Sequence, residues 1–237
     1  GMPVQISHIK LAQRSLWGQA DSLLGTLDRA RAEGIEVTAD IYPYPYWQST
    51  LTVLFPERDF TDRAEAEYAL REVAAPEGLL LGHYGPEPAW SGKTVAEIAA
   101  IRGTDPATTL MDLIRLSLEA DSAGRDGDES VVGTSMDERD IERIMRWPHA
   151  NFCSDGSLRG AHPRGYGAFT RVLGLYVRER GTLSLGEAVR RMTSLSAEHV
   201  GLEGRGRLAP GYAAGLVLFH PGTVIDVATP AGRRSGR

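Results

Sequence analysis

Acidic and basic side chains gather just after a short apolar run in the second half of the sequence. Asp155 lies in a Ser-Asp-Gly tripeptide that follows Asn151–Cys153. A carboxylate at the end of a buried strand can accept a proton from a metal-bound water and later donate it to a leaving amine. The same Asp-Gly pair is also common in turns. His162 and Arg164 follow within one loop, where an arginine could bind a substrate carboxylate through two hydrogen bonds or could be an ordinary surface residue.

A histidine and an aromatic segment occupy comparable positions earlier in the chain. His8 closes the apolar segment Pro3–Ile9, and a neutral imidazole at a strand end is a good zinc ligand. A hydrogen bond from this imidazole to a neighbouring loop is the structural alternative. Asp40 and Tyr42 end the next apolar segment. Tyr42 opens the run Tyr-Pro-Tyr-Pro-Tyr-Trp, which suits the wall of a binding pocket or, equally, an aromatic plug over a sheet.

The remaining cysteine and histidine side chains are expected to have structural rather than catalytic roles. Cys153 precedes Asp155 by two residues and would face the same side of a strand, but nothing near it marks a nucleophile. His83 could reach a site only if its segment folds back as a lid. No acidic or histidine partner at ligand spacing accompanies His149, His199 or His220. No Walker-type loop, GxGxxG motif or nucleophile-elbow serine is found, which excludes the simplest nucleotide-binding and serine-hydrolase interpretations.

Composition excludes further functional classes. The chain has 237 residues with 26 Lys+Arg against 31 Asp+Glu, a formal net charge of −5, so neither a nucleic-acid surface nor a polybasic membrane patch is indicated. Its single cysteine excludes an internal disulfide framework and a cysteine-based structural zinc site. No apolar stretch is long enough to cross a membrane, and no secretory leader is recognisable. We therefore expect a cytoplasmic protein that has no nucleic-acid or membrane partner.

Hydrophobic periodicity predicts strands and helices that alternate. Pro3–Ile9 and Ile35–Tyr42 are typical of buried strands, and residues 19–33 between them have helical spacing. A strand, a helix and a strand with short joints form a βαβ unit with parallel strands. The pattern returns with strands at Glu129–Thr134 and Ala150–Ser154, separated by a helix that a Ser135 capping box opens. The sequence therefore predicts an α/β fold.

Two regions depart from this alternation. Roughly 85 residues separate the second and third predicted strands, far more than an ordinary joint. Cap signals at Asp62 and Thr94 predict helices there, so we expect an inserted helical subdomain. Turn residues between short apolar runs in 206–229 predict a small antiparallel sheet. The final residues have no apolar periodicity and are expected to be a frayed tail.

Several of these segments together resemble the metal-dependent amidohydrolase superfamily, and more narrowly its D-aminoacylase (N-acyl-D-amino-acid deacylase) branch. The matching stretches run in family order along nearly the whole chain: 6–10 (ISHIK), 37–44 (VTADIYPY), 135–138 (SMDE), 154–156 (SDG), 162–164 (HPR), 166–172 (YGAFTRV), 183–193 (LSLGEAVRRMT) and 206–219. The resemblance implies that a water activated by a divalent metal, usually zinc, attacks the amide of an N-acyl-D-amino acid.

The resemblance also implies a fold and roles for individual residues. The chain would form the C-terminal half of a TIM-like (β/α) barrel. His8 would be the metal-ligand histidine of the fifth strand, and Asp155 the acid of the eighth strand that shuttles the proton. The expected substrate-binding side chains lie near this acid or on the aromatic wall: Arg164, Tyr166, Tyr42 and His162. The implied organisation is 2–55 (strands five and six with a helix), 56–128 (helical insert), 129–204 (strands seven and eight with helices), 205–230 (part of a small β domain) and 231–237 (tail).

The family pattern is matched only in part. Its His-x-His pair and its metal-bridging Cys or Glu are not found in this sequence, and zinc needs three or four protein ligands. Three hypotheses stay open. The chain is the C-terminal half of an amidohydrolase with little activity alone, or a partner chain or second copy completes the barrel, or the chain is a catalytically inactive structural or binding module.

Overall fold

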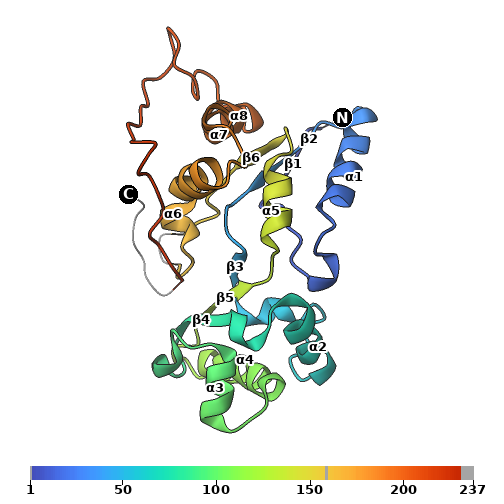
Figure 1. Cartoon of the computed structure of the whole chain (residues 1–237). Coiled ribbons are helices and arrows are strands. Elements are labelled where there is room, and N and C mark those ends of the chain that lie inside the picture. Colours follow the sequence, from blue (N-terminus) through green and yellow to red (C-terminus); the bar gives the residue numbers. More distant parts are fainter. Residues whose placement is uncertain (1, 158–159, 231–237) are drawn as a thin grey trace.

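Short apolar segments build a parallel sheet in the upper part of the molecule (Figure 1). The computed structural model describes residues 2–157 and 160–230. Strands β1 (Val4–Ile6), β2 (Val37–Ile41) and β6 (Ala150–Phe152) lie in the order β1-β2-β6, each parallel to its neighbour. Alternate side chains of β2 are buried, and all side chains of β6 are buried. Both patterns are typical of strands that helices cover.

Helices pack against this sheet. Helix α1 (Ala20–Ala32) connects β1 to β2, so the predicted strand–helix–strand unit is confirmed. Helix α5 (Glu138–Met145) packs against α1 and β2, and α7 and α8 pack against β6. The helices after β6 follow one another with short joints: α6 (Arg164–Arg171), its π-helical continuation Val172–Glu179, α7 (Leu185–Met192) and α8 (Ser194–His199).

Two aspartates fix the position of α5. The sequence predicts Ser135 as the helix cap, but the structure places Asp137 there, with its carboxylate accepting a hydrogen bond from the first turn. Ser135 is buried instead. Within the helix, the buried carboxylate of Asp140 accepts hydrogen bonds from the backbone N–H groups of Gly18 and Ala20. These donors lie at the start of α1, where a helix favours negative charge.

A second sheet, antiparallel, lies in the lower part of Figure 1. Strands β3 (Tyr46–Ser49), β4 (Leu79–Tyr84) and β5 (Glu129–Thr134) lie in the order β3-β5-β4. The prediction that residues 129–134 extend the parallel sheet is wrong, because the strand forms but pairs antiparallel. A short apolar run does not reveal the direction of its partners. Within the described residues the parallel sheet has three strands rather than the four that we expected.

Residues 56–128, the predicted helical insert, contain three α-helices and also strand β4. Asp62 caps one helix, Thr94 and Glu97 form a reciprocal capping box on the next, and Gly103 ends that helix with φ 66°. Such left-handed backbone favours glycine. The α-helices are α2 (Arg63–Tyr68), which Ala69–Val73 continues as a π-helix, α3 (Val95–Arg102) and α4 (Pro106–Ser122). Short 3₁₀ helices lie at Leu51–Leu54, Pro76–Gly78 and Pro88–Trp90, and one more, Arg14–Leu16, lies between β1 and α1.

The C-terminal segment does not form the predicted small sheet. Residues 206–229 contain no strand and run along the helical side of the parallel sheet. Leu216, Val217 and Leu218 are 72%, 87% and 100% exposed. An apolar run forms a strand only where another strand or a core meets it, and nothing in the described chain does so here. The predicted tail, 231–237, lies outside the described residues. No helix in the described ranges is long and apolar enough to cross a membrane.

A buried carboxyl in the second sheet makes stability depend on pH. One oxygen of Glu129 accepts a hydrogen bond from Leu51 N at 2.7 Å, and the other is buried with no partner in the part of the chain that the structure describes. Burial raises the pKa of Glu129 to about 7. A folded-state pKa above the unfolded value stabilises at low pH, and this contribution is lost as pH rises through 7. We expect a loss of up to about 3 kcal/mol between pH 5 and pH 8.

Glu129→Gln tests this expectation in urea unfolding at the two pH values. The variant should be more stable than the parent protein at pH 8, and the difference should shrink at pH 5. Glu119→Gln is the control, since Glu119 is half-exposed and pairs with Arg115 on the surface. An equal stability difference between Glu129→Gln and the parent protein at both pH values would contradict the assignment.

Candidate active site

The carboxyl edge of the parallel sheet gathers the main chemical side chains. His8 follows β1 and Asp155 follows β6, with φ of 41° and 46°. Non-glycine residues in this left-handed region are uncommon and tend to cluster at functional sites. β1 and β6 flank β2, and neighbouring strands lie about 4.8 Å apart, which places these strand ends roughly 10 Å from each other. The structure therefore brings the two residues to one edge, as the sequence predicts.

Asp155 and Arg164 form the central ion pair. Arg164 Nη1 lies 2.7 Å from Asp155 Oδ2, and the arginine side chain is 11% exposed. Its guanidinium also lies over the ring of Tyr42, 4.8 Å from the centroid. The Tyr42 hydroxyl is buried and has no hydrogen-bond partner among the described residues. Burial raises the pKa of Tyr42, so the phenol keeps its proton and can donate it to an acceptor in the site.

Lys10 belongs to the same group, although the sequence analysis assigns it no role. Its Nζ lies 2.7 Å from His8 Nδ1 and 5.2 Å from the centroid of the Tyr42 ring. Burial lowers the pKa of Lys10 to about 8, and the Asp155 carboxylate opposes this shift. Lys10 follows His8 by two positions, and residues two apart share a face of an extended segment. This spacing is the sequence feature that could have assigned Lys10 to the site.

Asp40 holds the backbone that carries His8. Its Oδ1 accepts a hydrogen bond from His8 N at 2.7 Å, and its Oδ2 accepts one from Gln5 Nε2 at 3.1 Å. Cys153 lies nearby, and burial together with the Asp40 carboxylate raises the pKa of its thiol. A protonated thiol is a poor nucleophile, which agrees with the structural role expected for Cys153.

The predicted substrate-binding residues occupy different environments. Tyr42 and Arg164 adjoin the acid, and Tyr166 lies half-buried in the first turn of α6. His162 is buried at 3% exposure, and both ring nitrogens are hydrogen-bonded to backbone groups. Its imidazole has no free nitrogen to offer a ligand, so the expectation of direct substrate contact is corrected. His83 is half-exposed in the insert, 3.8 Å from Asp126, and does not join the site.

The residues of this chain do not complete a zinc site by themselves. Zinc takes three or four protein ligands in its stable sites. Residues 2–157 and 160–230 contain no group of three or more His, Cys, Asp or Glu side chains placed to hold an ion. His8 and Asp155 have suitable donor atoms, but they need further ligands.

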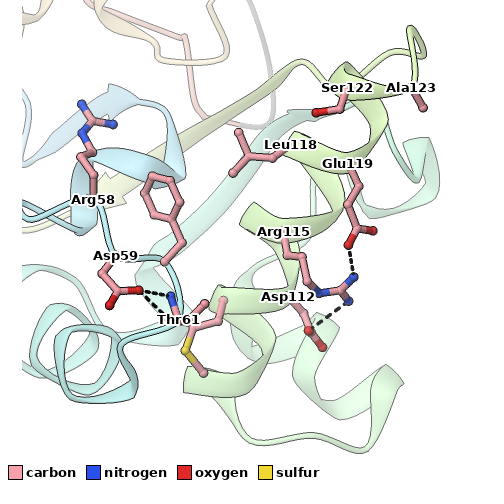
Figure 2. Close-up of a pocket in the computed structure, with 11 residues that line it drawn as sticks. Arg58, Asp59, Thr61, Asp112, Arg115, Leu118, Glu119, Ser122 and Ala123 are labelled. Atoms are coloured by element: carbon pink, nitrogen blue, oxygen red, sulfur yellow. Dashed lines mark hydrogen bonds and ion pairs between the residues drawn. The ribbon is translucent and has the colours of Figure 1, made fainter.

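A groove lies on the insert, away from the carboxyl edge of the parallel sheet (Figure 2). Its volume is about 830 Å³, and it runs between α4 and the segment before α2. Arg115 pairs with Asp112 and Glu119 along one wall, and Asp59 accepts hydrogen bonds from Thr61 on the other. None of the side chains at the sheet edge lines it, and Asp59, Asp112, Arg115 and Glu119 already have partners within the groove wall. Volume alone therefore does not identify the site.

The fold is an α/β fold whose parallel sheet carries an acid, a histidine and two cations at its carboxyl edge, the edge at which many α/β proteins place their functional groups. More particularly, the chain belongs to the amidohydrolase family, whose model matches residues 58–234. The resemblance seen in the sequence is therefore confirmed.

Individual relatives match almost the whole chain. It is 38% identical to N-acyl-D-glutamate deacylase and 33% identical to D-aminoacylase, both from Alcaligenes xylosoxydans xylosoxydans, over 97% and 99% of its length. These matches cover 41% and 43% of the relatives. The structure of N-acyl-D-glutamate deacylase from Bordetella bronchiseptica with zinc and a phosphonate inhibitor superposes with a TM-score of 0.81 at 34% identity, over 100% of this chain and 44% of that one. The chain thus spans about two fifths of the length of its relatives.

Proposed function

We propose that this chain is part of a hydrolase that cleaves the amide bond of N-acyl-D-amino acids. In this reaction water adds across the C–N bond, so the acyl carbon gains a hydroxyl and the nitrogen gains a proton. The products are a carboxylic acid and a free D-amino acid. The observation that carries the proposal is the Asp155–Arg164 pair at the carboxyl edge of the sheet, in a chain whose relatives act on such substrates.

Asp155 is the proposed proton carrier. Its carboxylate is 31% exposed beside the cationic Arg164, so it is open to the site. It would accept a proton from the attacking water and return it to the amide nitrogen as that bond breaks. His8 is the proposed metal-ligand histidine, with the remaining ligands supplied from outside the described residues. A divalent metal in such a site supplies a polarised carbonyl and a more acidic water.

Cationic and phenolic groups are the proposed holders of the substrate carboxylate. The guanidinium of Arg164 can bind a carboxylate in two-pronged fashion. The unpartnered hydroxyl of Tyr42 adds a donor, and Lys10 adds a second cation on the same ring. Tyr166 is the remaining candidate for this contact. We also propose that β1, β2 and β6 are three strands of a TIM-like barrel that further residues or a partner chain complete.

Replacing Arg164 with glutamine is expected to weaken binding of N-acetyl-D-glutamate roughly 10- to 100-fold, because the substrate carboxylate loses a charge-assisted hydrogen bond. Calorimetric titration of the parent protein and the variant measures this loss, and N-acetyl-L-glutamate tests selectivity. Arg63→Gln is the matched control, since Arg63 forms an exposed ion pair with Asp105 in the insert. Equal binding of the two enantiomers by the parent protein would contradict the proposal.

Turnover and assembly separate the alternatives. The chain is incubated with zinc and a panel of N-acetyl-D-amino acids, and free D-amino acid is measured along with the molar mass in solution. Release of D-amino acid by an oligomer favours a site completed by a second copy. Selective binding of the D-enantiomer without release favours a binding part whose metal ligands come from elsewhere, in keeping with the incomplete ligand set in the described residues.

A further inference from the structure

An imidazole connects strand β3 to the proposed substrate-binding arginine. His162 is enclosed by the rings of Tyr42, Tyr44 and Tyr46, all edge-on, with centroids 5.8, 5.5 and 5.9 Å away. Its ring is 3% exposed. Edge-on contacts of this kind stabilise one orientation of the ring. The imidazole is therefore held on its faces and edges by the segment that leads from β2 into β3.

The hydrogen bonds of this ring permit a single tautomer. Arg164 N donates to His162 Nδ1 at 2.9 Å, so Nδ1 must carry a lone pair. The other nitrogen, Nε2, then carries the proton and donates it to Tyr46 O at 2.8 Å. Burial lowers the pKa of His162 to about 3, which agrees with a neutral ring. The buried imidazole is fully satisfied in this state.

These bonds connect two elements that are far apart in the sequence. Tyr46 opens β3, and Arg164 is the first residue of α6, where a helix leaves its backbone N–H groups without internal partners. The backbone N–H of His162 also donates to Gln48 Oε1, again in β3, at 2.8 Å. The backbone of Arg164 is thus attached to β3 through one ring. Its side chain reaches from there to Asp155.

We propose that His162 is a positioning residue, which sets the backbone of Arg164 against β3 and so aims the guanidinium at Asp155 and the substrate carboxylate. The statement that Arg164 meets the substrate carboxylate, the substrate part of this inference, rests on the proposed function. The statement that His162 fixes the backbone of Arg164 against β3, the geometric part, is independent of it. His162 acts through Arg164 and does not touch the substrate itself.

Two variants separate the two bonds of the ring. Asparagine at 162 offers an oxygen near the place of Nδ1 and can still accept from Arg164 N. Glutamine at 162 offers an amide N–H near the place of Nε2 and can still donate to Tyr46 O. We expect His162→Asn to retain affinity for N-acetyl-D-glutamate within about threefold and His162→Gln to lose about tenfold. His149→Gln, at a ring that lies edge-on to Trp147, is the control and should bind like the parent protein.

Measurements without a ligand decide the geometric part. In the parent protein, nitrogen NMR of His162 should find Nε2 protonated and Nδ1 bare, with no titration above about pH 4. Amide hydrogen exchange at Arg164 should be slow in the parent protein and in His162→Asn, and fast in His162→Gln. A protonated Nδ1, or equal exchange in the two variants, would overturn the positioning role even if binding is selective. Failure of the parent protein to bind the probe would instead overturn the proposed function and the substrate part of the inference.

Discussion

Asp155→Asn is expected to lower the rate of D-amino acid release roughly 10²- to 10⁴-fold, the usual contribution of a general acid–base group. The amide of asparagine can accept a hydrogen bond from Arg164 but cannot take a proton from water and deliver it to nitrogen. Binding of N-acetyl-D-glutamate should therefore change much less than turnover. Steady-state kinetics in the assembly that turns over substrate, with calorimetric binding in parallel, measures the two effects.

The control for this substitution is another carboxylate held by arginine. Asp112 lies in the insert, away from the sheet edge, where it pairs with Arg102 and Arg115. Asp112→Asn should leave turnover unchanged. Full turnover by Asp155→Asn would show that the proton passes through a different group.

Arg191→Met is expected to lower the free energy of unfolding by about 3 to 5 kcal/mol, the range for breaking a buried charged network. Arg191 is 3% exposed. Its Nη1 donates to the carbonyl oxygens of Met145 at 2.7 Å and Ala150 at 3.1 Å, and its Nε lies 2.6 Å from Glu187 Oε1. The substitution leaves the last carbonyls of α5 and the start of β6 without their donor, and leaves Glu187 partly unpaired.

The neighbouring arginine supplies a matched control. Arg190 pairs with the same Glu187 at 2.8 Å, but its side chain is 40% exposed. An exposed pair of this kind contributes little, so Arg190→Met should cost less than about 1 kcal/mol. Urea unfolding of both variants tests the contrast. Similar decreases in the free energy of unfolding for the two substitutions would contradict the expectation that burial strengthens the contribution of Arg191 to stability.

Local patterns predicted the elements that local forces determine. The β1–α1–β2 unit followed from the apolar spacing of its segments, and the helix caps at Asp62 and Thr94 are confirmed. Strand β3 was missed because it begins directly after Pro43 and Pro45, where turn residues outweigh a short Tyr-Trp-Gln-Ser run. Whether β5 pairs parallel or antiparallel depends on strands that are distant in the sequence. The hydrophobic periodicity of a segment does not specify those partners.

The candidate site was predictable to the same extent. His8 and Asp155 could be found because each follows an apolar run, and the ends of parallel strands meet at one edge. The burial of His162 could not be found, because the tyrosines that enclose it precede it by more than a hundred residues. Burial lowers the pKa of Lys10, and the Asp155 carboxylate opposes this shift. Only the folded arrangement buries the ammonium and brings that carboxylate near it.

The bare apolar run Leu216–Leu218 has a consequence for handling the protein. Its side chains are among the most exposed apolar groups in the described chain, and an uncovered hydrophobic run favours self-association. In a concentrated purified sample, we therefore expect this run to promote aggregation of the protein over time. A charged residue in place of Val217 would slow this aggregation, because electrostatic repulsion between copies opposes the attraction between their exposed leucine side chains.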